Sequence, residues 1–442
     1  VVNKLREACA SGVPITFRSG GTSLSGQAVT DSLMLDTRAH FKKIEVLDNG
    51  ARVRVQPGAT VREVNTRLAR FGYKLGPDPA SEAACTIGGV IANNSSGMVC
   101  GTEFNTYKTL ESMVLVFADG TRINTADKDA DIQLKSKLPE LYEAMVRLRG
   151  RIHSQPHVVA EIKRQFSIKN TMGYGVNAFL DFTSPIDIIS HLIIGSEGTL
   201  AFVAEATFRT VPIKPHVATS LLVFDSLQHA TFSLSKLVES GLAAIELLDS
   251  TSLKVAQSDP KAPRELQDIQ VRNHSALLVE FQELNEESLG SSINRSRELL
   301  RELSVLNHPQ FRKEPKVRGD LWHIRKGLYA TVAGNRPSGT TALLEDIAVP
   351  ISFLAETCSS LVNLFAKHNY QESVIFGHAK DGNIHFLLNE RFDDKLSLAR
   401  YSKFTEDMVE LVLGNSGTLK AEHGTGRIMA PFVKRQYGEE IY

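Results

Sequence analysis

Two histidines enclose a short, turn-rich stretch, HAKDGNIH, at residues 378–385. An Asp-Gly pair between extended residues is a strong signal for a tight β-hairpin turn. With Asp381 and Gly382 as the two loop residues, His378 faces His385 across the hairpin. Directly opposed residues on one face of an antiparallel pair have Cβ atoms roughly 5 Å apart. The stretch therefore predicts two imidazoles side by side, although structural histidines are the commoner outcome for such a pair taken alone.

The bulk composition narrows the classes of protein to consider. A chain of 442 residues is expected to form more than one domain. Its 50 basic and 50 acidic side chains balance, which argues against a nucleic-acid partner or a polybasic membrane patch. No apolar run approaches the roughly 18 residues of a transmembrane helix. The four scattered cysteines form no CxxC pair, so we expect a reducing compartment and neither disulfides nor a cysteine-ligated metal or iron–sulfur site within this chain.

The elements that would position any chemistry begin with a glycine-rich loop, RSGGTSLSG, at residues 18–26. It follows a strand-like run, VPITF, and such a loop can turn its backbone N–H groups onto phosphate oxygens. The loop lacks the lysine of a P-loop and the GxGxxG pattern of a Rossmann fold. Taken alone, it fits a plain glycine-rich hairpin equally well.

Two further segments rich in small residues follow. A capping box at Thr60 and Glu63 predicts a helix whose apolar stripe runs from Val61 to Phe71. The segment 76–97 then combines glycines with Asn and Ser, which allows close backbone approach to a ligand and polar contacts to it. The last segment, at residues 195–203, reads GSEGTLAFV.

In this order and spacing, the three segments resemble the FAD-binding domain of the vanillyl-alcohol oxidase superfamily, the FAD-linked oxidases, and the resemblance covers essentially the whole chain. It implies that the first two segments hold the FAD pyrophosphate and that the third lies beside the flavin and adenosine. The implied FAD contacts are Arg18, Ser19, Gly20, Gly21, Thr22, Ser23, Pro79, Ser81, Thr86, Gly89, Asn93, Ser96, Glu197, Gly198 and Val203, with Tyr174 at the flavin face.

The resemblance also implies how FAD is held. Members that attach the flavin covalently through this loop carry histidine directly after the two glycines, whereas Thr22 stands here. We therefore expect non-covalent FAD.

The fold implied by the resemblance is α+β. A PCMH-type FAD-binding domain of two subdomains is expected over residues 1–212, without the family's first strand and turn. An α+β substrate or cap domain with an antiparallel sheet is expected over 213–442, and its last segment, from about 415, is expected to return to the flavin.

Two motifs of the second half match the family patterns HAxDGNxH and GEHGxG, namely HAKDGNIH and AEHGTGR. Two imidazoles and one carboxylate leave open positions for substrate, as in a catalytic divalent-metal site. The resemblance thus implies that His378, His385 and Glu422 bind zinc or manganese.

The remaining catalytic roles are also implied by the resemblance. His423 is expected to be the general base, because a neutral imidazole suits proton abstraction near neutral pH; the alternative is a turn-capping histidine. Arg325 is expected to grip a substrate carboxylate, and the alternative is a surface or interfacial arginine. Asn383 either donates to that carboxylate or is only a turn residue.

The implied activity is oxidation of a D-2-hydroxy acid, such as lactate or 2-hydroxyglutarate, to the 2-oxo acid, with hydride transfer to FAD. Leu344 stands where D-2-hydroxyglutarate dehydrogenases carry a lysine for the distal carboxylate, so lactate-like substrates remain equally credible. The alternatives are an alkylglycerone-phosphate-synthase-like flavin transferase, which lacks the histidine pair, and a non-catalytic FAD-binding subunit of a larger oxidase complex.

The expected partners follow from this activity. Electrons from the reduced flavin would pass to an iron–sulfur domain, a quinone, a cytochrome or an electron-transfer flavoprotein. The expected location is cytoplasmic, with a peripheral position at the inner membrane as the second option, and a homodimer is a candidate assembly.

Overall fold

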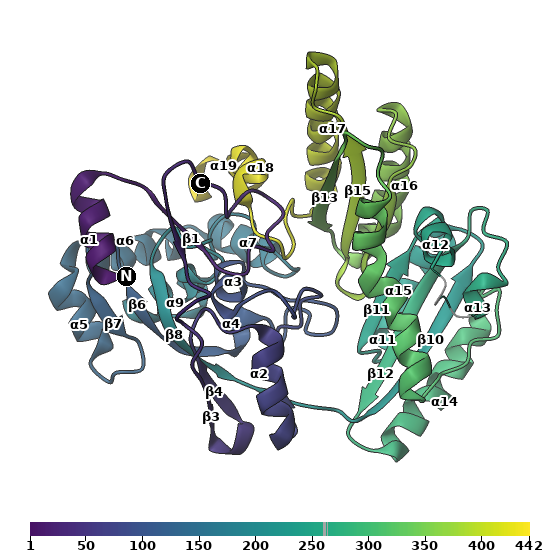
Figure 1. Ribbon diagram of the computed structural model, residues 1–442, viewed down its shortest axis with the longest axis horizontal. Helices are drawn as coiled ribbons and strands as arrows, with labels where there is room; N and C mark the ends of the chain where they lie inside the picture. The colour runs from purple at the N-terminus through teal and green to yellow at the C-terminus, as the bar shows by residue number, and fades with distance from the viewer. Residues whose placement is uncertain (260–261, 263) are drawn as a thin grey trace. The chain divides into compact units, whose positions relative to one another are not determined.

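The computed structural model describes residues 1–259, 262 and 264–442. The chain forms two compact units, the first made of Val1–Ile213 and Lys420–Tyr442 and the second of Lys214–Leu419. In Figure 1 the yellow C-terminal helices α18 (Gly426–Met429) and α19 (Val433–Ile441) belong to the same unit as the purple N-terminal segments. Both units combine helices with a main sheet that is wholly antiparallel, which confirms the predicted α+β class.

A five-stranded antiparallel sheet forms the centre of the first unit, in the order β3-β4-β8-β6-β7. Its residues alternate between core and surface as a half-buried strand requires, so that Val53 and Val55 of β4 are fully buried while Arg52 and Arg54 point outward. The strands are β3 (Ile44–Leu47), β4 (Arg52–Val55), β6 (Leu110–Val116), β7 (Arg122–Asn124) and β8 (Phe202–Arg209).

The glycine-rich loop at residues 18–26 connects two parallel strands, β1 (Ile15–Arg18) and β2 (Leu33–Asp36). The hairpin alternative for this loop is therefore wrong, because a hairpin joins antiparallel strands. A second two-stranded sheet pairs β5 (Tyr73–Lys74) with β9 (Val211–Pro212).

Helices surround these sheets. The predicted capping box is confirmed at the start of α2 (Val61–Leu68), where Thr60 Oγ1 accepts from the Glu63 N–H at 3.1 Å. The other helices are α1 (Val2–Ser11), α3 (Ile87–Ala92), α4 (Thr106–Thr109), α5 (Ala130–Lys137), α6 (Pro139–His153), α7 (Pro156–Gln165), α8 (Ala178–Asp181) and α9 (Pro185–Ile193).

The second unit is built on a six-stranded antiparallel sheet in the order β10-β12-β11-β14-β15-β13. One core cluster joins α12 and α15 to the sheet, with Leu253, Leu321 and Leu328 packed against strand residues such as Leu248 and Leu278. The strands are β10 (His216–Phe224), β11 (Ala244–Leu248), β12 (Ser275–Glu283), β13 (Thr341–Ala348), β14 (Val374–His378) and β15 (Asn383–Glu390). The helices are α10 (Leu227–Phe232), α11 (Leu234–Glu239), α12 (Ser250–Gln257), α13 (Arg264–Gln267), α14 (Glu286–Glu302), α15 (Pro315–Gly334), α16 (Ile351–Lys367) and α17 (Lys395–Gly414).

In the part of the chain that the structure describes, no helix is both long and apolar enough to cross a membrane.

Candidate functional site

The stretch that carries the two histidines is a β-hairpin, but its register differs from the prediction. His385 pairs with Phe376, and residues Ala379–Asp381 form a turn of 3-10 helix before Gly382. Gly382 has φ 65°, and a Cβ there would overlap the carbonyl oxygen of Val349. The connection is therefore longer than the two-residue turn expected from Asp-Gly, because the turn packs against the segment after β13.

The two imidazoles nevertheless lie side by side. Their ring centroids are 5.1 Å apart, the rings are nearly perpendicular at 87°, and both side chains are buried. His378 closes β14 and its partner across the other edge of that strand is Glu246 of β11. The paired imidazoles thus lie at the centre of the sheet of the second unit.

Glu246 joins two of the residues singled out in the sequence. Its Oε1 lies 2.8 Å from His378 Nδ1, and its Oε2 accepts from Arg325 Nε at 2.6 Å. Glu246 is fully buried, and the Arg325 guanidinium also lies over the Phe376 ring, 4.9 Å from its centroid. Glu246 lies outside the motifs that the sequence displays. The available signal was an acidic residue inside an apolar strand, AIELL, since a buried charge requires a partner.

A second carboxylate lies beside His385. Asp346 Oδ1 is 3.3 Å from His385 Nδ1, and the same oxygen accepts from Asn383 Nδ2 at 2.9 Å. Asn383 Nδ2 also donates to the carbonyl oxygen of Ile347, at 2.9 Å. The amide expected at a substrate carboxylate is thus bound to β13 within the second unit.

Glu422, the predicted carboxylate ligand, lies in the first unit, and its Oε1 is 3.9 Å from His423 Nε2. Its Oε2 accepts from Ser96 Oγ at 2.7 Å and lies 3.3 Å from Lys169 Nζ. Lys169 also donates to the carbonyl oxygen of Gly97 at 2.9 Å, and its side chain is only 2% exposed. Lys169 could not be predicted from the sequence, because a lone lysine in SIKNT carries no local signal of burial.

His423, the predicted base, is anchored by its main chain. Its carbonyl oxygen accepts from Gln27 Nε2 at 2.9 Å and from Asn93 Nδ2 at 3.3 Å. Gln27 Nε2 donates in addition to Glu197 Oε1 at 2.8 Å, and the carboxylate of Glu197 accepts from the Gly426 N–H at 3.0 Å. Burial raises the pKa of the Glu197 carboxyl, and these hydrogen bonds partly offset that effect.

Three predicted FAD contacts, Asn93, Ser96 and Glu197, therefore use their side chains to hold the C-terminal segment that carries Glu422 and His423. This role is invisible in the sequence because more than two hundred residues separate the partners in each case.

The loops expected to hold the pyrophosphate lie against one another. The hydroxyls of Ser19 and Thr86 are hydrogen-bonded, and Thr37 Oγ1 donates to Ser19 Oγ at 3.2 Å. A Cβ at Gly20 would overlap the carbonyl oxygen of Ala84. Arg18 Nε is buried and has no hydrogen-bond partner among the described residues. Close backbone packing and an unsatisfied cationic donor fit an anionic group such as a pyrophosphate.

The other predicted FAD contacts lie on the same loops and on one strand. Gly21 and Thr22 are exposed and Ser23 is half-buried, while the carbonyl oxygens of Pro79 and Ser81 accept bonds within the turn that precedes Thr86. Gly89 lies in α3, where a Cβ would meet no described atom within 4 Å. Gly198 has φ 76°, and Val203 pairs with Leu115 in the central sheet of the first unit.

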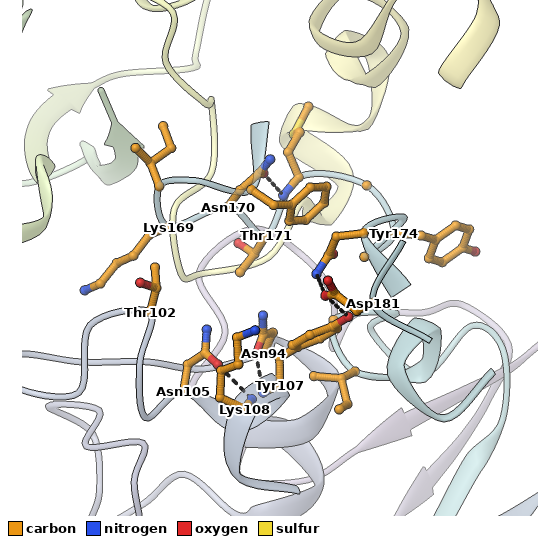
Figure 2. Close-up of a pocket in the computed structure, with 18 of the residues that line it drawn as sticks. Asn94, Thr102, Asn105, Tyr107, Lys108, Lys169, Asn170, Thr171, Tyr174 and Asp181 are labelled. Atoms are coloured by element: carbon orange, nitrogen blue, oxygen red, sulfur yellow. Dashed lines mark hydrogen bonds between the residues drawn. The ribbon is translucent and has the colours of Figure 1, made fainter. Parts of the chain in front are cut away.

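A polar cavity of about 290 Å³ lies in the first unit beside Lys169 (Figure 2). Asn94, Asn105 and Lys108 come from the segment around α4, and Asn170 and Thr171 face them from the segment before Tyr174. Tyr107 Oη donates to Asp181 at 2.8 Å, and burial raises the pKa of Tyr107. Tyr174 lines the cavity and its hydroxyl is 2.9 Å from Thr199 Oγ1. Of the segments predicted at FAD, residues 93–96 contribute Asn94 to the lining of this cavity, and Tyr174 lines it as well.

The chain thus has two α+β units, one with glycine-rich loops suited to a nucleotide cofactor and one with paired imidazoles in an antiparallel sheet. The family model of the C-terminal domain of FAD linked oxidases matches residues 213–442, and an FAD binding domain model matches residues 1–126. The chain belongs to the FAD linked oxidases, as the sequence resemblance indicated, and the matched domains support FAD as its cofactor.

Named relatives in this family are oxidoreductases. The chain is 26% identical to D-2-hydroxyglutarate dehydrogenase of Haemophilus influenzae over 97% of its own length, and 26% identical to mitochondrial D-lactate dehydrogenase [cytochrome] 1 of Saccharomyces cerevisiae over 99%. It is 24% identical to glycolate oxidase subunit GlcD of Bacillus subtilis over 97% of its length. The chain spans 43%, 66% and 79% of these three relatives, respectively.

Among solved structures, alkyldihydroxyacetonephosphate synthase has a similar fold, with a TM-score of 0.64 and 14% sequence identity. The match covers 95% of this chain and 70% of the synthase chain. At this identity the likeness concerns the fold alone.

Proposed function

We propose that this protein is an FAD- and divalent-metal-dependent dehydrogenase that oxidises a D-2-hydroxy acid to the 2-oxo acid. The observation that carries the proposal is the pair of buried imidazoles, 5.1 Å apart, in a chain of the FAD linked oxidase family. Named relatives act on D-2-hydroxyglutarate and D-lactate, which supports the substrate class.

FAD would be held by the loop around Ser19 and Gly20 and by the segment around Thr86. When bound, FAD supplies the hydride acceptor for oxidation of the substrate's C2 carbon. Because Thr22 replaces the histidine of covalent members, the cofactor is non-covalent. Acid precipitation of the yellow protein should therefore leave the colour in the supernatant, and colour in the pellet would refute this point.

His378 and His385 are the proposed metal ligands, with Glu422 as the third ligand implied by the family motif. The donor set fits: buried imidazoles with a carboxylate beside each Nδ1 are typical of zinc ligands, whose other ring nitrogen faces the metal. Imidazole-rich ligation favours zinc over manganese. A divalent metal here would supply Lewis-acid polarisation of the substrate hydroxyl.

Three residues of this chain would abstract the proton, bind the substrate and position a neighbouring side chain. His423 takes the proton of the C2 hydroxyl as a general base while the C2 hydride leaves, so that the hydroxy acid becomes the oxo acid. Arg325 binds the substrate carboxylate by its guanidinium. Asn383 positions Asp346 beside His385, a role that its hydrogen bonds to Asp346 and Ile347 support better than substrate binding.

Substrate size depends on the distal contact. Leu344 is half-buried on β13 and offers no charge for a second carboxylate, so D-lactate and D-2-hydroxyglutarate are both candidates.

The experiment is anaerobic stopped-flow bleaching of the flavin band in FAD-loaded protein, with a panel of D- and L-2-hydroxy acids. We expect one D-acid to bleach the flavin with zinc or manganese present, and a chelator to abolish the bleaching. If FAD and metal are both bound and no acid bleaches the flavin, the dehydrogenase is ruled out. An ether-forming transferase or a non-catalytic FAD-binding subunit would then be the function that the observations favour.

A further inference from the structure

Glu246 lies between two groups with different proposed tasks. One of its oxygens meets the Nδ1 of His378, a proposed metal ligand, and the other meets the Nε of Arg325, the proposed substrate-binding cation. We infer that Glu246 is a positioning residue that fixes both groups at once and so couples metal binding to substrate binding. The inference rests on the proposed function and deepens it.

The geometry supports a fixed carboxylate. Glu246 lies at the centre of β11 and is directly opposed to His378 in the antiparallel pair with β14. Its side chain is fully buried, and the side chains of His378 and Arg325 are only 5% and 6% exposed. Two short charge-assisted contacts of 2.6 and 2.8 Å leave the carboxylate little freedom to rotate.

Each contact has a chemical consequence. A carboxylate at Nδ1 sets the tautomer and ring orientation of His378, so that Nε2 is the nitrogen presented to a metal. The contact with Glu246 is made by Nε of the Arg325 guanidinium. The two terminal nitrogens then keep the side-by-side geometry in which they can bind both oxygens of a substrate carboxylate.

Two glutamate substitutions distinguish the positioning role of Glu246 from a general contribution to folding. In Glu246→Gln, the amide nitrogen replaces one acceptor by a donor, so the side chain can no longer accept from both His378 and Arg325. Glu280→Gln is the matched control. Glu280 is a buried glutamate on the neighbouring strand β12, where it binds Trp322 Nε1 at 2.5 Å and Thr219 Oγ1 at 2.6 Å.

The measurement is zinc affinity of the FAD-loaded full chain, by competition with a chromophoric chelator. We expect Glu246→Gln to weaken zinc binding roughly 10–100-fold, the range found when such carboxylate partners of metal-bound histidines are removed. Glu280→Gln should bind zinc as the wild type does. At saturating zinc, the KM for the 2-hydroxy acid should rise in Glu246→Gln by a larger factor than kcat falls, because the Arg325 guanidinium is no longer held in place by a carboxylate at Nε.

Arg325→Lys provides a second variant if Glu246→Gln does not fold. It keeps a cation beside Glu246 but loses the planar Nε contact that fixes the Glu246 carboxylate. Zinc affinity should therefore fall, although residue 325 is not a proposed metal ligand. Equal zinc affinity in the wild type, Glu246→Gln and Arg325→Lys would overturn the inference while leaving the metal site intact. A wild-type protein that binds no zinc and no manganese would instead overturn the proposed metal site, and the inference with it.

Discussion

Ser96 and Glu422 are 326 residues apart in the chain and are joined by a hydrogen bond of 2.7 Å. Lys169 reaches the same carboxylate oxygen, at 3.3 Å. The segment that carries the predicted metal ligand and base is therefore attached to the segment predicted to hold FAD. A change that disorders the segment around Ser96 should therefore also disorder the segment around Glu422, and the reverse.

The ion pair between Lys169 and Glu422 gives the first prediction. Lys169→Met leaves a carboxylate that is only 10% exposed without its ammonium partner, which should cost about 3 kcal/mol of the free energy of unfolding. Urea unfolding in the presence of a chelator measures this loss.

The double variant Lys169→Met/Glu422→Gln is the control, because it removes the charge that Lys169→Met leaves uncompensated. It should regain most of the lost stability, as expected for coupled partners. Additive effects of the two substitutions would show that the ion pair does not couple these residues.

Gly89 gives the second prediction, because nothing in the structure explains a glycine there. It lies in helix α3 with open space where a Cβ would stand. Gly89→Ala should therefore stabilise the FAD-free protein by about 0.5–1 kcal/mol, the usual gain within a helix. If FAD approaches this backbone closely, the same substitution should lower FAD affinity at least tenfold, as measured by fluorescence titration.

Gly150→Ala is the matched control, since Gly150 lies in helix α6 with equally open space and is not predicted at FAD. It should give the same gain in stability and leave FAD affinity unchanged. Equal FAD affinity in both variants would remove Gly89 from the cofactor site.

Local features of the fold could be predicted from the sequence. The capping box at Thr60 starts a helix whose buried positions Val61, Val64 and Leu68 follow the expected stripe. The predicted stripe is one turn too long, because α2 ends at Leu68 and Phe71 is 47% exposed. The start of a helix depends on hydrogen bonds between residues close in sequence, which a sequence pattern can reveal. The end of a helix depends on what the next turn packs against, which the pattern does not show.

Pairings between distant segments could not be predicted. The sequence does not specify that β1 and β2 are parallel or that Phe376 faces His385, because both depend on packing partners elsewhere in the chain. Motifs identified the paired histidines, yet Glu246 and Lys169 lie outside any motif. They were missed because their roles exist only through the residues they contact.

His423 gives the third prediction. In His423→Ala, the carbonyl oxygen still accepts from Gln27 and Asn93, so the loop should keep its position. Flavin reduction by the hydroxy acid should slow by roughly 10²–10⁴-fold, the usual contribution of a general base. FAD content and zinc affinity should match the wild type. Near-normal reduction in stopped-flow experiments would exclude His423 as the base.

Asp249 gives the fourth prediction, on stability against pH. It caps α12 by accepting from the Ser252 N–H at 2.7 Å, and it also accepts from the Ile375 N–H at 3.0 Å. Burial raises the pKa of its carboxyl from 3.8 to about 6, and these bonds offset only part of the effect. The folded state therefore binds a proton more readily than the unfolded state between about pH 4 and pH 6.

The sign of the effect follows from this difference in proton binding. Above pH 6 the buried carboxylate is ionised and its desolvation cost is fully present; as the pH falls from about 6 to about 4, protonation removes that cost. Relative to Asp249→Asn, which has no titrating group there, the wild type should gain on the order of 2–3 kcal/mol over this window. Urea unfolding of both proteins from pH 7 to pH 4, with a chelator present, measures the difference. A difference that stays constant over this range would show that Asp249 titrates at its ordinary pKa in the folded protein, with its hydrogen bonds compensating for burial.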